Sequence, residues 1–284
     1  MDAVVLSLVS AFLFGAMTVV LRVALRRGNA EVGAFVTVLA AFLVVAAWAL
    51  LESASLDGRG LAIFAFAGLL APGGSQLLFT LAVRDVGASR TSVVTGAAPL
   101  FAVVIALLVL REPFRVGLAL GAVLIVVGGI VLAVERGRPE QFLAVGLVFA
   151  AAGALLFAVR DNYVRAFSDD VSIDASAGAA VALLVGAVAT LAYVAVRRPG
   201  DLRELRSWPP FLPVGILFGL SYVSLYEAYF RGRVTVVSPL VATEALWGVG
   251  LSALLLRRHE LVGPRLAAGA ALVVAGGALI GIFR

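Results

Sequence analysis

The sequence predicts an all-α integral membrane protein with ten transmembrane helices, arranged as two inverted repeats of five helices each. Three observations predict this class. First, 62% of the 284 residues are apolar and only 14% are charged, whereas soluble domains carry about 25% charged residues. Second, the apolar residues fall into long runs that charged residues avoid. Third, the second half of the chain repeats the first.

The composition also excludes several classes of chemistry. The chain has no cysteine, so disulfides, thiol redox chemistry and thiolate metal sites are ruled out. Its one histidine, His259, leaves no histidine cluster for a metal. We therefore expect no cofactor, no metal and no enzymatic activity. The net charge of +5 comes from arginines, which we assign to loops facing anionic lipid and not to nucleic-acid binding.

Ten apolar runs, each bounded by charged or turn-forming residues, are the predicted spans. Each has about 18–23 residues, enough to cross about 30 Å of hydrocarbon at 1.5 Å per residue. None alternates as the strands of a β-barrel would. The runs are Ala3–Leu25, Gly33–Leu51, Leu61–Val83, Ser92–Leu110, Val116–Val134, Phe142–Val159, Ala175–Val196, Phe211–Tyr229, Val234–Leu256 and Leu266–Phe283.

An internal repeat divides the chain into residues 1–138 and 139–284. The stretch 86–134 matches 234–282 without a gap at a shift of 148 positions, and the matches include Gly121 with Gly269 and Gly128 with Gly276. The chain starts agree at a shift of 138. Because five spans is an odd number, the second copy enters the bilayer from the opposite face. Such inverted repeats are typical of transporters, whose substrate site lies near the midplane where the halves meet.

Two carboxylates are predicted to lie inside spans, Glu244 and Glu227. A charge at membrane depth costs from about 3 kcal/mol on insertion scales to over 10 in simulations. Such a group must face the bundle interior, form an ion pair with an opposite charge, or take up a proton. Glu244, near the middle of its run, is the main candidate for proton coupling or for binding a cationic group; the alternative is a structural pair with Arg90 or Arg22. Glu227, near a helix end, has Arg231 four residues on as an alternative structural partner.

Polar and aromatic side chains mark a possible cavity wall. Tyr222 and Tyr226 crowd the eighth run, and Gln76 lies in the third. Thr18 belongs to a line of small polar residues along the first run. The alternative is a set of interhelical hydrogen bonds, each worth about 0.6 kcal/mol. Trp247 is too deep for an interfacial aromatic belt, so it either packs in the core or lines the cavity.

Two arginines, Arg22 and Arg160, lie at the predicted ends of the first and sixth runs and match each other in the repeat. By inversion, one belongs near each membrane surface. They are candidates for gates or for binding anionic substrate groups. The alternative is that they anchor the helix ends by reaching to the interface.

The same motif ends both repeats. Glu112 closes the fourth run and glycines follow in the fifth; Glu260 and a second set of glycines repeat this in the ninth and tenth. These motifs resemble those of EamA-type permeases of the drug/metabolite transporter superfamily. The resemblance implies two five-helix repeats, export in preference to uptake, and cytoplasmic termini. The chain departs from the family at Trp247, where the repeat mate Pro99 keeps the usual proline.

These observations favour a multi-pass protein of the cell membrane that moves a small organic metabolite or amino acid by alternating access. Coupling would be to protons or by exchange, with membrane lipids as the surroundings and a monomer or homodimer as the unit. A passive channel and a membrane scaffold protein remain as alternatives. The side of the termini stays open, because most arginines lie in the loops opposite the termini, which places the termini outside by the positive-inside rule.

Overall fold

The computed structural model describes residues 2–98, 101, 105, 116–133, 143–168, 171–200, 208–231, 237, 240–255 and 263–283. Within these residues the fold is all-helical, with no β-strand. Six of the described helices are long and apolar enough to cross a membrane, and two further apolar helices are shorter. The prediction of an all-α integral membrane protein is confirmed at this level. Glu112, Glu260 and Pro99 lie outside the described residues.

The helices follow the order of the predicted apolar runs. Their bounds are α1 Ala3–Ala24, α2 Ala30–Leu51, α3 Gly58–Gly68, α4 Ser75–Val86, α5 Ala88–Thr95, α7 Val116–Ala133, α8 Val145–Ser168, α9 Ala175–Arg197, α10 Leu212–Arg231, α12 Glu244–Leu255 and α13 Pro264–Phe283. The predicted bounds are accurate to within three residues for six helices: α1, α2, α7, α9, α10 and α13.

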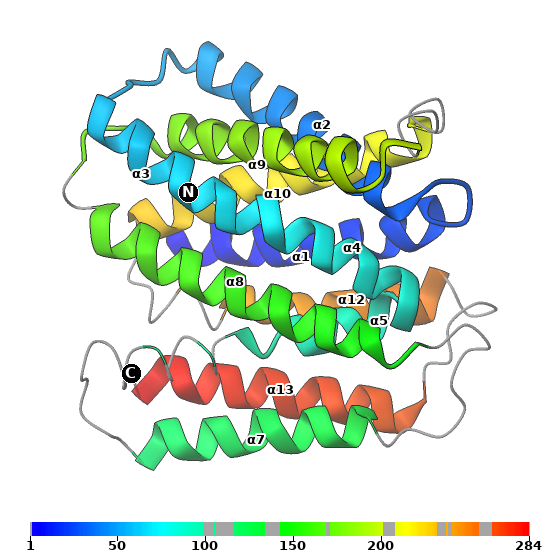
Figure 1. The fold of residues 1–284 in the computed structure, drawn as a ribbon. Helices are drawn as coiled ribbons and strands as arrows, with labels where there is room; N and C mark the ends of the chain where they lie inside the picture. The colour runs from blue at the N-terminus through cyan, green and yellow to red at the C-terminus, as the bar shows by residue number, and fades with distance from the viewer. Residues whose placement is uncertain are drawn as a thin grey trace.

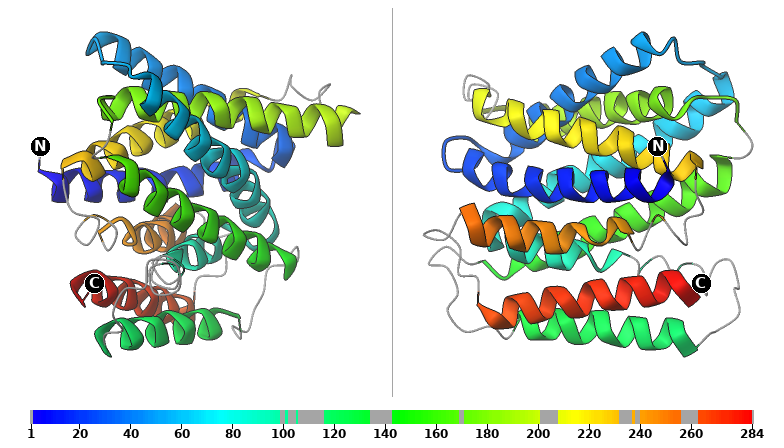
Figure 2. Two further views of the ribbon diagram at one scale, coloured as in Figure 1. Left: turned by 60° about the vertical axis from the view of Figure 1, so that its left-hand side comes forward. Right: turned by 180° about the vertical axis from the view of Figure 1, so that it is seen from behind.

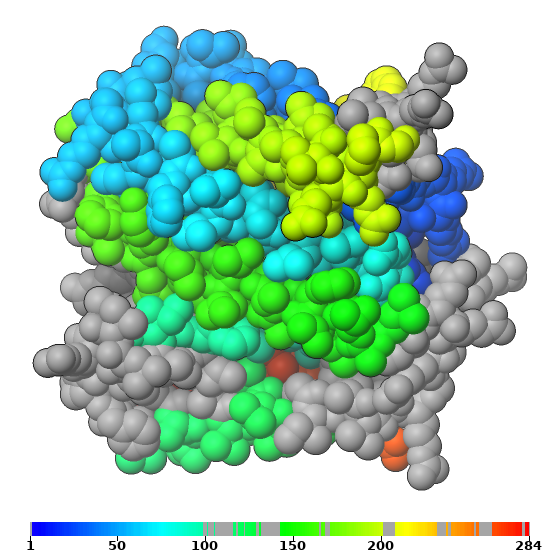
Figure 3. Space-filling model, viewed as in Figure 1, coloured from blue at the N-terminus to red at the C-terminus, as the bar shows by residue number. Residues whose placement is uncertain are grey.

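The helices lie roughly side by side in one bundle (Figure 1). A pair formed by α7 and α13 makes one flank, and α2 with α9 makes the other (Figures 1 and 2). Between the flanks, α1 packs on α10 and α12, while α8 packs on α4 and α5. Figure 3 shows α8 crossing one face of the molecule, with α3 and α4 on one side of it and α7 on the other. The first turn of α1 and the last turn of α13 lie at the same end of the bundle (Figure 2).

Contacts between the two flank helices α7 and α13 repeat themselves. A Cβ atom added to Gly128 would meet the carbonyl oxygen of Gly269 at 2.8 Å, and one added to Gly276 would meet that of Gly121 at 2.5 Å. Gly128 and Gly276 are 148 residues apart, as are Gly121 and Gly269. Each contact is therefore the image of the other under the internal repeat. The small residues let the two backbones approach closely, as in other membrane helix pairs.

The third span is not one continuous helix. Between α3 and α4, at Leu69–Gly74, Ala71 adopts an extended backbone with φ −146° and ψ 119°. Pro72 follows, and it has no N–H to continue the helical ladder. The prediction of an unbroken helix over 61–83 is wrong for this reason. The break frees the Ala71 carbonyl for a side-chain donor.

Two further predicted boundaries are wrong, and both change where charged residues lie. The sixth run was expected to end at Val159, but α8 continues to Ser168. Arg160 is therefore inside a helix and not at its end. The ninth run was expected to be one helix from Val234, but a turn at Ala242 and Thr243 precedes α12, and Glu244 is the first residue of that helix.

Candidate functional site

A cavity lies between α1, α5, α8, α10 and the segment leading into α12. It holds about 620 Å³ of empty space, counting the part that opens outward. Three of its lining residues have a guanidinium or carboxyl group: Arg160, Asp161 and Glu244. The full lining is Ser10, Phe14, Thr95, Gly96, Ala98, Phe157, Arg160, Asp161, Phe218, Ser221, Tyr222, Leu225, Tyr229, Val241, Ala242 and Glu244.

Arg160 is the most enclosed of the charged groups in this cavity, with a side chain only 3% exposed. Its Nη1 donates a hydrogen bond of 2.7 Å to the hydroxyl of Tyr222. The guanidinium carbon lies 5.6 Å from the ring centre of Phe157, 5.2 Å from that of Tyr222 and 5.8 Å from that of Tyr226. Such cation–π contacts strengthen when water is excluded. They help to hold a charge that the bilayer disfavours.

Asp161 supplies the nearest opposite charge. Its Oδ1 lies 2.7 Å from Nε of Arg160. Neighbouring residues on a helix do not face each other, and among the described residues neither of these two atoms has a partner with hydrogen-bond geometry. The two opposite charges nevertheless lie close enough to offset each other. Asp161 also interacts with the side chain of Tyr229.

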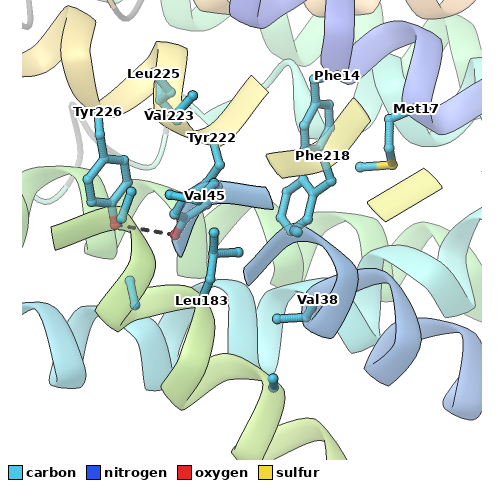
Figure 4. Close-up of a cluster of buried hydrophobic side chains, with 14 of the residues drawn as sticks. Phe14, Met17, Val38, Val45, Leu183, Phe218, Tyr222, Val223, Leu225 and Tyr226 are labelled. Carbon is cyan, nitrogen blue, oxygen red and sulfur yellow. Dashed lines mark hydrogen bonds between the residues drawn. The ribbon is translucent and has the colours of Figure 1, made fainter. Parts of the chain in front are cut away.

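Tyr222 connects this charged group to the break in the third span. Its hydroxyl donates a hydrogen bond of 2.8 Å to the carbonyl oxygen of Ala71, and it accepts the hydrogen bond from Arg160. The hydroxyl of Tyr226 lies 3.3 Å away, and Figure 4 shows the two rings side by side on successive turns of α10, with their hydroxyls joined by the dashed line. The carbonyl that the break frees is thus satisfied by a side chain of the second repeat.

Replacing Tyr222 with phenylalanine is expected to destabilise the protein by about 1–3 kcal/mol, since a buried guanidinium donor and a buried carbonyl both lose their partner. Thermal unfolding of the purified protein in detergent measures this. Tyr193→Phe is the matched control, because Tyr193 is 36% exposed on α9. Equal melting temperatures for the two variants would contradict the role given to the hydroxyl.

Glu244 also lines the cavity, at the start of α12. The side chain of Thr95, at the end of α5, is within hydrogen-bonding reach of its carboxyl group, and the charges of Asp161 and Arg160 act on it. The cation near Glu244 is therefore Arg160. Arg22, one of the structural partners considered from the sequence, donates instead to the carbonyl oxygens of Val83 and Arg84 at 2.9 and 2.7 Å, at the end of α4.

Two serines join the repeats at the cavity wall. Ser10 Oγ donates to the carbonyl oxygen of Ser221 at 2.9 Å, and Ser221 Oγ donates to that of Ser10 at 2.9 Å. The two hydroxyls are 3.1 Å apart. The reciprocal bonds hold α1 close to α10.

The structure brings Tyr222, Arg160 and Glu244 together in the cavity. Tyr226 is not among the lining residues, but its ring centre lies 5.8 Å from the guanidinium carbon of Arg160.

The other predicted site residues lie elsewhere. Glu227 pairs with Arg231 through an Oε2–Nε contact of 2.7 Å. Thr18 donates to the carbonyl oxygen of Phe14 in its own helix. Gln76 is fully buried in α4. Trp247 is 42% exposed and packs edge-to-face on Phe12.

Several lining residues escaped the prediction from sequence, above all Asp161 and Phe157. Hydropathy places the boundary of the sixth run at Arg160 and Asp161, so it does not mark Asp161 as a cavity residue. The apolar and aromatic residues that follow, Tyr163 and Val164, were the available signal that the helix continues. Ser10 and Thr95 carry no local signal, since serine and threonine in a span usually bond their own helix.

Together, the long apolar helices and the cavity between them, with its charged lining, are typical of a multi-span membrane protein. The comparison with protein families then identifies the group: the model of the EamA-like transporter family matches the chain twice, over residues 1–134 and 139–282. The chain belongs to the EamA-like transporter family. It is a membrane transporter of small molecules, and members of this family are transporters and not enzymes.

The fold has a close counterpart among solved structures. One crystal structure superposes on this chain with a TM-score of 0.68, and the match covers 98% of this chain and 97% of the other at 19% sequence identity. At this identity the likeness concerns the fold alone. No protein with a curated description matches the sequence.

Proposed function

We propose that the protein is a secondary transporter of the cell membrane that moves a small organic metabolite or amino acid by alternating access, in the direction of export. In this proposal ten transmembrane helices form two inverted five-helix repeats, 1–138 and 139–284. The observation that carries it is the cavity itself, whose walls come from α1 and α5 of the first half and from α8, α10 and the start of α12 of the second. In inverted-repeat transporters the substrate site lies between the halves in this way.

The contacts between the halves support the inverted arrangement. Helix α1 packs on α10, while α8, at the corresponding place in the second half, packs on α4. The glycine contacts between α7 and α13 are likewise repeated when each residue is replaced by its counterpart in the other half. Movement of one half against the other would open the cavity first to one side of the membrane and then to the other.

The two carboxylates of the cavity favour coupling to protons or exchange of substrates. Glu244 and Asp161 line the same cavity as Arg160, so a change in the protonation of one carboxyl group alters the charge that a substrate meets. In this way the binding of a proton or a substrate can determine whether the cavity changes the side of the membrane to which it opens.

Transport in proteoliposomes tests this function. A first thermal-shift screen of the purified protein against amino acids, sugars, nucleotides and cationic drugs identifies a compound that stabilises it. Counterflow of that compound, radiolabelled outside and unlabelled inside, should then be saturable and faster than uptake into empty vesicles. Flux that neither saturates nor shows counterflow would indicate a passive channel instead. An intact fold with no flux of any stabilising compound would favour a scaffold protein.

A further inference from the structure

Thr95, the last residue of α5, has one hydroxyl hydrogen and several acceptors within reach. Its Oγ1 lies 2.9 Å from the carbonyl oxygen of Thr91 and 3.2 Å from that of Ser92, and it donates to the backbone of its own helix. The carboxyl group of Glu244 is also within hydrogen-bonding reach of this hydroxyl, and both residues line the cavity. The backbone carbonyls and the carboxyl group therefore compete for one hydrogen.

The number of hydrogens decides which of these bonds coexist. A hydroxyl donates one hydrogen and also accepts, an ionised carboxylate only accepts, and a protonated carboxyl group donates as well. While Thr95 donates to its own helix, it binds Glu244 only as an acceptor, and Glu244 must then carry a proton. When Glu244 loses that proton, the hydrogen of Thr95 has to turn from the backbone to the carboxylate. The direction of this hydrogen bond thus depends on the protonation of Glu244.

The internal repeat shows that only one half of the chain carries this contact. The counterpart of Thr95, 148 residues on, is Thr243. Thr243 also donates to the carbonyl oxygen three residues before it, that of Leu240. The counterpart of Glu244 in the first half is Gly96, which has no side chain. The two threonines share their bond to the backbone, while the carboxyl group is present only in the second half.

The other ionisable groups around Glu244 come from α8 and α10. Arg160 and Asp161 of α8 act on its charge, and Tyr222 and Tyr229 of α10 complete the ionisable part of the described lining. Helices α1, α5 and α13, which also pack on α12, contribute no ionisable side chain to that lining. The effects of the α8 cation and anion on a Glu244 carboxylate oppose each other, so the hydrogen bond from Thr95 contributes noticeably to the balance between its two forms.

We propose that Thr95 is a positioning residue for the proton-coupling step, whose hydroxyl accepts a hydrogen bond from protonated Glu244 and donates one to the ionised form. The proton that leaves the Glu244 carboxyl group passes to water at the open side of the cavity, and only O–H bonds break and form. A hydrogen bond to a charged group is about twice as strong as a neutral one, so Thr95 favours release of the proton. This inference rests on the proposed function, because it assigns a partner to its coupling group.

Infrared difference spectroscopy of the full chain in proteoliposomes tests this without a substrate, with the proton itself as the probe. The carbonyl stretch of protonated Glu244 is identified as the band that Glu244→Gln removes, and its intensity is followed against pH. Thr95→Val neither donates nor accepts, and it is expected to raise the midpoint of this titration by about one pH unit, because the ionised form loses the stronger bond. Thr95→Ser keeps the hydroxyl and should restore the native midpoint.

Thr190→Val is the matched control. Thr190 is a buried threonine of α9 that donates to the carbonyl oxygens of Ala187 and Gly186 at 3.0 and 2.9 Å, and it does not line the cavity. Its replacement should leave the midpoint unchanged. If Thr95→Val does not fold, Thr95→Ala removes the same hydroxyl with a smaller side chain. An unchanged midpoint without the Thr95 hydroxyl, or an equal shift in Thr190→Val, would overturn the proposal.

The outcomes separate this inference from the proposed function. Saturable counterflow in a protein whose Glu244 titration does not respond to Thr95→Val would leave a transporter in which Thr95 has no part in coupling. A shifted titration in a protein that shows no counterflow of any stabilising compound would confirm the hydrogen bond and remove the transport proposal.

Discussion

Replacing Glu244 with glutamine is expected to abolish proton-coupled transport while the protein remains folded. The carboxyl group lines the cavity beside Thr95 and within the field of Arg160 and Asp161. Glutamine keeps the shape and the hydrogen-bonding capacity but takes up no proton. Accumulation driven by a pH gradient across proteoliposomes should therefore disappear. Counterflow of substrate, which needs no net proton movement, should persist.

Glu227→Gln is the matched control for this experiment. Glu227 is the other carboxylate predicted within a span, but it pairs with Arg231 at the end of α10 and does not line the cavity. Its replacement should preserve pH-driven accumulation. If Glu244→Gln gives unchanged pH-dependent flux, Glu244 is not the coupling group.

The second large effect is expected where the third span meets α9. Replacing Gly68 with alanine would place a Cβ atom 2.6 Å from Cα and 2.8 Å from the carbonyl carbon of Ala182, with its carbonyl oxygen closer still. All three atoms belong to backbone, which cannot move aside as a flexible side chain can. Overpacking of this kind typically costs about 1–3 kcal/mol, and the contact here allows little relaxation. We expect a lower melting temperature and a smaller yield of monodisperse protein.

Gly250→Ala provides the comparison for Gly68→Ala. Gly250 also lies in a helix, α12, but a Cβ atom added there meets nothing within 4 Å. Its replacement should leave the melting temperature unchanged or raise it slightly, because alanine favours the helix by about 1 kcal/mol over glycine. Similar destabilisation by both substitutions would show that close packing at Gly68 is not the cause.

Much of the helical framework could be predicted because its physical signal is local. Runs of apolar residues bounded by charged or turn-forming residues define α1, α2, α7, α9, α10 and α13 closely. The membrane sets the length of such a run and the backbone must satisfy its own hydrogen bonds within it. The internal repeat also predicted that distant segments correspond to each other, and the matching contacts of Gly128 and Gly276 agree with this.

The features that make the site could not be predicted from local hydropathy. Arg160 and Asp161 look like a helix boundary, yet they offset each other's charge and face a cavity, so α8 continues past them. The broken third span depends on Ala71 having a partner, and that partner, Tyr222, comes from a distant helix. Glu244 lies at the start of α12 and not within a long helix, and its neighbours in the cavity come from α5 and α8. Such arrangements depend on tertiary contacts.

The central claim is that the cavity opens to each side of the membrane in turn, and the absence of cysteine from the chain allows a direct measurement. A single cysteine at Val241, on the cavity wall, is labelled with a membrane-impermeant maleimide in sealed vesicles of each orientation, and Val123→Cys on the exposed face of α7 serves as the control. The account predicts labelling of the cavity position from both sides, with the two rates changing in opposite directions when a transported compound is added to one side, and no labelling of the control. Labelling from one side only under all conditions, or from both sides at rates that no compound changes, would contradict it.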